Sequence, residues 1–199
     1  MTITTVEELR RMKRVGKVVS EALDAMKKKV AVGVSTLALD EACARVFERH
    51  GARSAPQLVY NFPGAACISL NYEAVHGIPL ASRFLKAGDL VKLDVTAELD
   101  GFFADAAITV PVSKISQQNM KLAECAESAL RVGIEAAQVG QPLNQNGSGV
   151  HTEVERCGFK VMRQLGGHGV AGQSTKKPAS QISTIQRSVK SSAPALLLL

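Results

Sequence analysis

The pair Asp100-Gly101 separates two runs of alternating apolar and polar residues, LVKLDVTAEL before it and FFADAAITVPV after it. Asp-Gly between two such runs is among the strongest short-range signals for a two-residue β-hairpin turn. Closing the chain at this turn places Thr96 opposite Asp105 in an antiparallel pair. We therefore expect a long two-stranded ribbon near the middle of the chain, around which the rest of the fold is built.

The same register places two carboxylates on one face of the ribbon. Asp94 comes to lie opposite Ala107, and Asp94 and Asp105 become diagonal neighbours with Cβ atoms within roughly 7–8 Å. Adjacent carboxylates repel each other unless a proton or a cation lies between them, and a divalent ion is the common solution. The alternative is that both are solvated strand residues, although Asp is disfavoured in strands.

The opposite face of the ribbon carries only apolar side chains and is expected to pack into a core: Leu93, Val95, Ala97, Leu99, Phe102, Ala104, Ala106 and Ile108. Periodic apolar residues and capping signals predict helices from the Thr5 cap to about Gly33, over 36–50, from the Ser116 cap to about Gln138 and, more weakly, over 143–156. Shorter apolar runs predict strands over 67–71 and 159–165. Helices combined with antiparallel strands give an α/β fold of the α+β kind.

Length and composition favour a single soluble domain. The chain has 199 residues, of which 46% are hydrophobic, and no apolar run approaches the roughly 20 residues that span a bilayer. The four cysteines form no C-x-x-C pair and are expected to be reduced, mostly buried thiols. The N-terminus has no apolar segment typical of a secretory signal, which favours a cytoplasmic protein.

The net charge of +6 is confined to the C-terminal part of the chain. All 18 acidic residues lie at or before Glu155, so the body is almost neutral and no specific nucleic-acid surface is expected. Residues 171–199 contain no aromatic residue, no acidic residue and no sustained period. We expect a folded domain over 1–170 and a disordered tail over 171–199.

Two histidines lie among residues that allow a close approach of the backbone. His76 stands in VHGIP, beside a flexible Gly and near a rigid Pro, and His168 stands between glycines in GGHGV. Either imidazole could bind a metal or donate a hydrogen bond, and the alternative in each case is a plain loop residue. The glycines around His168 complete no phosphate-binding motif.

Three segments in order carry a family resemblance: NFPGAACISLNYEAVHGIP, GDLVKLDVTAELDGFFADAAITVPV and GFKVMRQLGGHGV. Together they closely resemble the type I methionine aminopeptidases of the pita-bread metallopeptidase family, over about residues 6 to 170. The resemblance implies a pita-bread fold, in which helices cover an antiparallel sheet. It also implies removal of N-terminal methionine from nascent polypeptides by a cytoplasmic, monomeric enzyme, with a transient association with ribosomes.

The resemblance also assigns roles to individual residues. It makes Asp94, Asp105 and His168 ligands of two divalent metal ions, of which cobalt, manganese, iron and zinc all suit such ligands. It makes His76 the residue that contacts the scissile peptide and helps to stabilise the tetrahedral intermediate. Phe62 and Cys67 match positions that line the pocket for the methionine side chain.

The sequence departs from the family after His168. Family members continue with a second histidine and two acidic residues and later supply two glutamate ligands, whereas no His, Asp or Glu follows His168 here. We therefore expect the second half of the fold to be incomplete and the activity to be impaired. The run QSTKK, residues 173–177, can be encoded by codons that give Ile-His-Glu-Glu when they are read in a shifted frame. This possibility suggests a frameshift beyond about Gly169.

Two other hypotheses remain open from the sequence. One is a catalytically inactive pita-bread protein that binds peptides or ribosomes. The other is a remnant that does not fold stably, because unpaired strand edges and exposed apolar surface promote aggregation.

Overall fold

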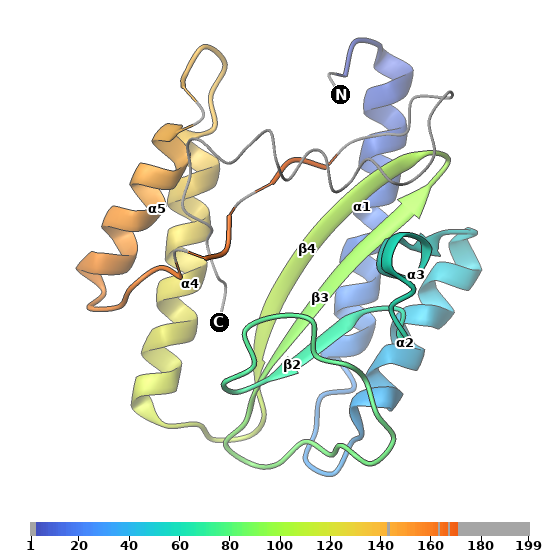
Figure 1. Cartoon of the computed structure of the whole chain (residues 1–199), viewed down its shortest axis with the longest axis vertical. Coiled ribbons are helices and arrows are strands. Elements are labelled where there is room, and N and C mark those ends of the chain that lie inside the picture. Colours follow the sequence, from blue (N-terminus) through green and yellow to red (C-terminus); the bar gives the residue numbers. More distant parts are fainter. Residues whose placement is uncertain (1–2, 143, 163, 167, 171–199) are drawn as a thin grey trace. The chain divides into compact units, whose positions relative to one another are not determined.

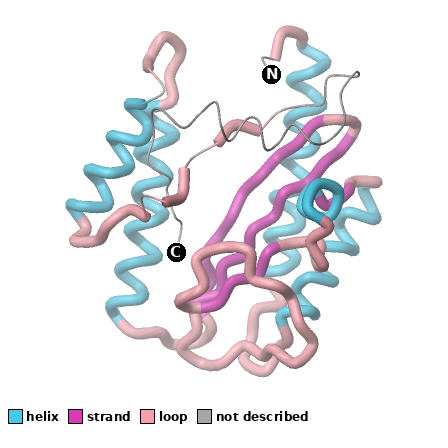
Figure 2. Tube along the Cα trace, in the orientation of Figure 1, coloured by secondary structure: helices cyan, strands magenta, loops and turns pink. Residues whose placement is uncertain are grey.

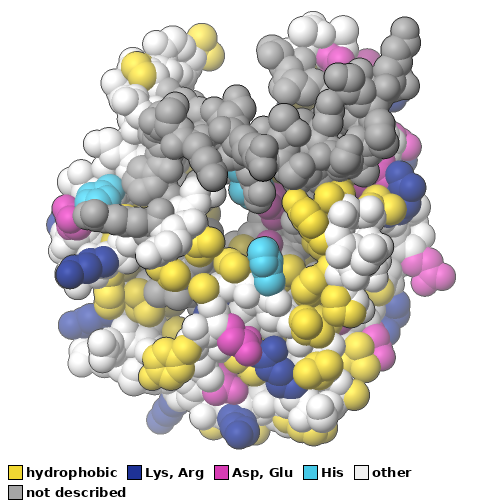
Figure 3. Space-filling view, in the orientation of Figure 1, with side chains coloured by type: hydrophobic (Ala, Val, Ile, Leu, Met, Phe, Trp, Pro, Cys, Tyr) yellow, Lys and Arg dark blue, Asp and Glu magenta, His cyan; other side chains and the backbone are white. Residues whose placement is uncertain are grey.

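The computed structural model describes residues 3–142, 144–162, 164–166 and 168–170, and it divides them into two compact units (Figure 1). Of the described residues, the first unit contains 3–115 and Val170, and the second contains those within 116–169. The tail that we expect over 171–199 lies outside the described residues. No helix in the described ranges is long and apolar enough to cross a membrane. On the face shown in Figure 3, the acidic and basic side chains of these residues lie interspersed.

Two helices begin the first unit, α1 (Val6–Lys27) and α2 (Thr36–His50). The Thr5 hydroxyl accepts a hydrogen bond from the Glu8 amide at 3.1 Å, and the Glu8 carboxylate accepts one from the Thr5 amide at 3.0 Å, so the predicted capping box is confirmed. The expected end of α1 near Gly33 is wrong. The helix ends at Lys27, and the Lys29 amide donates to the Met26 carbonyl at 2.9 Å in the turn that follows; Gly33 donates to the Leu85 carbonyl at 2.8 Å.

The sheet described in the first unit has four antiparallel strands, with β3 (Leu90–Leu99) at its centre. Strand β4 (Phe102–Pro111) pairs along all of β3, while β2 (Cys67–Leu70) and the short β1 (Arg53–Ser54) pair with opposite ends of β3. The short helix α3 (Ala55–Tyr60) follows β1. Neither β1 nor α3 was predicted from the sequence.

The predicted hairpin and its register are confirmed. Thr96 is the partner of Asp105 and Asp94 is the partner of Ala107. Asp100 and Gly101 have φ angles of 54° and 82°, and positive φ at both central residues is what a type I′ turn requires. The right-handed twist of this turn matches that of the strands on either side of it.

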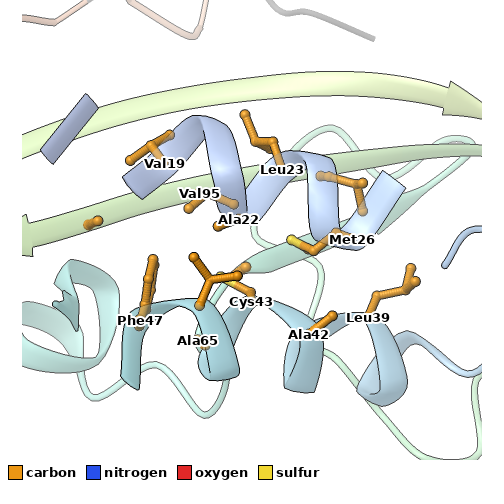
Figure 4. Close-up of a cluster of buried hydrophobic side chains, with 14 of the residues drawn as sticks. Val19, Ala22, Leu23, Met26, Leu39, Ala42, Cys43, Phe47, Ala65 and Val95 are labelled. Carbon is orange, nitrogen blue, oxygen red and sulfur yellow. The ribbon is translucent and has the colours of Figure 1, made fainter. Parts of the chain in front are cut away.

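The core of the first unit lies between the sheet and the two helices α1 and α2, which cover one face of the sheet (Figure 2). Helix α1 supplies Val19, Ala22, Leu23 and Met26, helix α2 supplies Leu39, Cys43 and Phe47, and β3 supplies Val95 (Figure 4). The predicted apolar face of the hairpin is confirmed for most of its members, but Ala106 is exposed. The carboxylate face therefore points away from this core.

The second unit contains helices α4 (Gln117–Ala136) and α5 (Asn144–Arg156), which pack through Cys125, Ala129, Val150 and Val154. A Cβ atom on Gly149 would lie 3.0 Å from a Val132 methyl, so this glycine allows the two helices to approach closely. The strand expected over 159–165 is not formed by the residues described there. Phe159 and Val161 pack against the two helices instead of pairing in a ladder.

Candidate metal and substrate site

The two hairpin aspartates lie together on the face of the sheet that α1 and α2 leave uncovered. Asp94 comes from the middle of β3, and Asp105 comes from β4, one diagonal step away. Asp94 is partly buried and Asp105 is exposed. The Thr96 hydroxyl donates a hydrogen bond to Asp105 Oδ1 at 3.0 Å, which holds this carboxylate against its neighbour.

The carboxylate of Asp105 influences the protonation of Asp94. Burial, the charge of Asp105 and a hydrogen bond shared with Asp105 raise the pKa of Asp94 from 3.8 to about 7. A pair of this kind holds either a proton or a cation near neutral pH. The arrangement is therefore chemically suited to bind a divalent cation through hard oxygen ligands.

The pair supplies only part of a coordination sphere. Within the described ranges, no group of three or more His, Cys, Asp and Glu side chains is placed to hold a metal ion. His168 belongs to the second unit, where it is exposed and its Nδ1 lies 3.4 Å from the Gly169 carbonyl oxygen. The carboxylate oxygens are thus suitable metal ligands, but a complete coordination sphere needs ligands besides these two side chains.

Cys67 opens β2 and lies directly opposite Asp94 on β3. Because opposed residues share a face of a sheet, the thiol lies on the carboxylate face. Burial and the negative charges of Asp94, Asp105 and Asp40 raise the pKa of Cys67 to about 12, while a hydrogen bond from the His76 backbone lowers it. Cys67 is therefore a neutral thiol and presents a small apolar surface beside the carboxylates.

The loop that carries His76 lies against β2. The Ile68 amide donates to the Gly77 carbonyl at 2.8 Å, and the Gly77 amide donates to the Ser69 hydroxyl at 3.0 Å. A Cβ atom on Gly77 would lie 2.2 Å from the Ile68 carbonyl oxygen, so only glycine allows this approach. His76 itself is exposed and has a φ angle of 59°.

The structure thus brings together four residues that the sequence singled out, Asp94, Asp105, Cys67 and the backbone of His76. Phe62 is half-buried and follows α3, where its amide donates to the Pro56 carbonyl at 3.2 Å. This position precedes Cys67 in the segment that leads into β2.

Sequence reasoning missed Asp40, which supports the site from the side of the helices. Asp40 is 7% exposed, and its Oδ1 accepts a hydrogen bond from the Ala66 amide at 2.9 Å, one residue before Cys67. Burial raises the pKa of Asp40 although two backbone hydrogen bonds lower it. A carboxylate three residues before Cys43, on the inner face of a predicted helix, was the signal that could have revealed it.

A model of metallopeptidase family M24 matches residues 10–192 of the chain. Methionine aminopeptidase 2 of Bacillus subtilis is 41% identical over 178 residues, which cover 89% of this chain and 72% of that protein. A methionine aminopeptidase of Staphylococcus epidermidis is 37% identical over 183 residues, covering 92% of this chain and 72% of that protein.

Solved structures show the same similarity. The crystal structure of methionine aminopeptidase from Rickettsia prowazekii superposes with a TM-score of 0.82 at 32% sequence identity. The match covers 89% of this chain and 71% of that chain.

Proposed function

Because the chain belongs to metallopeptidase family M24, we propose that it removes the N-terminal methionine of polypeptides by metal-dependent hydrolysis of the first peptide bond. The family and the pita-bread aminopeptidase fold are those that the sequence motifs predicted. The relatives at 41% and 37% identity are named for this reaction. The observation that carries the proposal is the coupled pair of Asp94 and Asp105, with Cys67 directly opposite Asp94.

Asp94 and Asp105 are the proposed carboxylate ligands, and His168 is the proposed imidazole ligand, of two divalent metal ions. When bound, such ions lower the pKa of a water molecule and polarise the scissile carbonyl group. Support for the carboxylate ligands comes from the raised pKa of Asp94, because a cation would compensate both the burial and the repulsion by Asp105 that raise it. Cobalt, manganese, iron and zinc all suit this set of ligands.

The proposed role of His76 is to donate a hydrogen bond to the oxyanion that develops on the scissile carbonyl oxygen. Its exposed position, on a loop that lies against Cys67, supports this role. A fixed donor aimed at a developing charge stabilises the transition state more than the bound substrate. We therefore expect His76 to contribute mainly to kcat.

Phe62 and Cys67 are the proposed lining of the pocket for the methionine side chain. The thioether of methionine packs favourably against an aromatic ring and against a neutral thiol. Neither the ring nor the thiol needs strong hydrogen bonds to offset the loss of water around it. The pKa of about 12 supports this assignment for Cys67, because a thiolate would repel the carboxylates and attract water.

The proposed partners are the N-termini of nascent polypeptides in the cytoplasm, with transient ribosome association. We propose a monomer that needs no specific nucleic acid for its activity. These statements follow from the reaction and from the family resemblance.

The test is release of free methionine from Met-Ala-Ser by the purified chain, first stripped of metal and then supplied with manganese or cobalt. Metal-dependent release that is lost in Asp94→Asn and in Asp105→Asn would support the proposal. No release by metal-loaded protein would overturn it for this chain. Binding of Met-Ala-Ser without turnover would then favour the peptide-binding alternative.

A further inference from the structure

The loop between β2 and β3, residues 71–89, carries His76 in its first half and is anchored by its second half. The Thr36 amide at the start of α2 donates to the Arg83 carbonyl at 2.8 Å, and the Leu85 amide donates to the Val34 carbonyl at 2.9 Å. The backbone at Arg83 is therefore tied to α2, an element that belongs to the core.

The side chain of Arg83 reaches from this anchored half to the half that carries His76. Its Nη1 donates to the carbonyls of Ile78 at 3.3 Å and Ile68 at 3.4 Å, and its Nη2 pairs with the Glu73 carboxylate. Glu73 also accepts a hydrogen bond from the Leu70 amide at 2.8 Å, at the end of β2. One guanidinium thus contacts the chain on both sides of His76.

We propose that Arg83 is a positioning residue that fixes His76 beside the carboxylate face, an inference that rests on the proposed function of His76. Positive φ is unfavourable for a residue with a side chain and persists where the surroundings enforce it. His76 has a φ angle of 59° and an exposed side chain, so its own burial contributes little to holding this conformation. The contacts of Arg83 with Glu73 and Ile78 enforce the path of the loop on either side.

The chemistry of the guanidinium suits this role. Its planar fork offers five donors in fixed directions, so it can satisfy two carbonyls and a carboxylate at the same time. In the ion pair with Glu73, the Arg83 side chain is only 20% exposed to solvent. Lysine at this position would keep the charge but not the simultaneous contacts.

The experiment compares Arg83→Met, Arg83→Lys and Glu73→Gln with the matched control Arg45→Met. Arg45 lies on α2 and pairs with Glu41 at 3.8 Å, with both side chains 55% exposed. The first readout is the NMR signal of the His76 imidazole in metal-free protein with labelled histidine, assigned through His76→Asn. The second is kcat and KM for Met-Ala-Ser in manganese.

We expect Arg83→Met to shift or broaden the His76 signal and to leave the signals of His50 and His151 unchanged. In the activity assay we expect kcat to fall on the order of 10- to 100-fold with KM within about twofold, since misplacing a catalytic group costs factors of this size. Arg83→Lys should recover part of both effects, and Glu73→Gln should cause a smaller change in the same direction. Arg45→Met should change neither readout.

An unchanged His76 signal in folded Arg83→Met would overturn the inference. If Arg83→Met does not fold, an unchanged His76 signal in Glu73→Gln overturns it in the same way. A wild-type chain that releases no methionine but whose His76 signal moves in Arg83→Met would refute the proposed function while supporting the positioning by Arg83.

Discussion

Cys67 lies directly opposite Asp94 across the β2–β3 pair, so a buried thiol and a carboxylate with a raised pKa share one face of the sheet. The proposed methionine pocket and the proposed metal site are therefore adjacent, because one residue of each is paired across the two strands. With the proposed roles of Cys67 and Asp94, this adjacency would place the side chain of an N-terminal residue next to the bond that follows it. The charge of Asp94 also contributes to the raised pKa of Cys67.

The protonation of Cys67 can be tested by thiol labelling. Burial raises the pKa of Cys67, and also those of Cys43 and Cys125, to about 12, so at about pH 8 almost none of these three thiols is ionised in the folded protein. We expect iodoacetamide to modify the half-buried Cys157 first and to leave Cys67 intact, as measured by peptide mass spectrometry. Labelling of all four thiols in concentrated guanidinium is the control, and equal native rates for Cys67 and Cys157 would contradict the prediction.

The raised pKa of Asp94 predicts how the stability of the metal-free protein changes with pH. Between the ordinary value of 3.8 and about 7, the folded protein binds a proton that the unfolded chain releases. The free energy of unfolding should therefore decrease, on the order of a few kcal/mol, as pH rises through this window. Urea unfolding in EDTA at several pH values measures it.

The matched variants for this experiment are Asp94→Asn and Asp24→Asn. Asp94→Asn removes this titrating group and should weaken the dependence on pH between about 4 and 7, leaving the smaller part that comes from Asp40, whose pKa burial also raises. Asp24 lies exposed on α1, and its replacement should leave the dependence as it is in the wild type. A slope that persists undiminished in Asp94→Asn would show that another group is responsible.

Asp40 should contribute to stability through its buried hydrogen bond with the Ala66 amide. Ala66 is fully buried, so Asp40→Ala leaves its amide without the acceptor that lies 2.9 Å away. An unsatisfied buried donor costs about 1–3 kcal/mol, and we expect the free energy of unfolding to fall by this amount. Asp40→Asn keeps an acceptor at the same position and should cost less. Equal losses in the two variants would mean that the charge, rather than the hydrogen bond, is what stabilises the segment.

Gly77 and Gly16 provide a paired test of the loop. In Gly77→Ala the new methyl group would lie 2.2 Å from the Ile68 carbonyl oxygen, so the loop has to move away from β2. We expect a loss of stability and a shifted His76 NMR signal. Gly16 on α1 has open space around it, and Gly16→Ala should stabilise the helix by about 0.5–1 kcal/mol. A Gly77→Ala variant as stable as the wild type, with an unmoved His76 signal, would refute the close approach.

The parts of the site that the sequence could predict depend on local patterns. The Asp-Gly turn determined the register of the hairpin, and the period of two then placed Asp94 and Asp105 on one face. Both facts require only residues that are close in sequence. The resemblance to known aminopeptidases added His76 and Cys67, which no local pattern would have joined to the aspartates.

The parts that could not be predicted depend on contacts between distant segments. Helix α1 ends at Lys27 and the segment after it contacts the loop before β3, where Gly33 donates to the Leu85 carbonyl, and β1 forms because Arg53 and Ser54 pair with the far end of β3. The segment after Phe159 has the composition of a strand but packs on helices in the part that the structure describes. A strand requires a partner ladder, and the sequence of one segment does not show whether that partner is present.

Metal binding is the prediction that tests the site most directly. Titration calorimetry of the metal-free protein with manganese should show binding that weakens at least 10-fold in Asp94→Asn and in Asp105→Asn, because each variant removes one of two adjacent oxygen ligands. The wild-type affinity should increase as pH rises toward about 7, since the proton held by Asp94 has to leave before a cation can bind.

His168→Asn distinguishes the proposed imidazole ligand from a plain loop residue. As a ligand, His168 should contribute to manganese affinity, whereas His151→Asn, which removes the pairing of a helix histidine with Glu155 at 3.0 Å, should not. Equal affinities in wild type and His168→Asn would remove His168 from the site and leave the two aspartates as its basis. Equal affinities in wild type, Asp94→Asn and Asp105→Asn would instead remove the hairpin from the metal site altogether, and the raised pKa of Asp94 would then reflect its burial and its neighbour Asp105 without a metal ion.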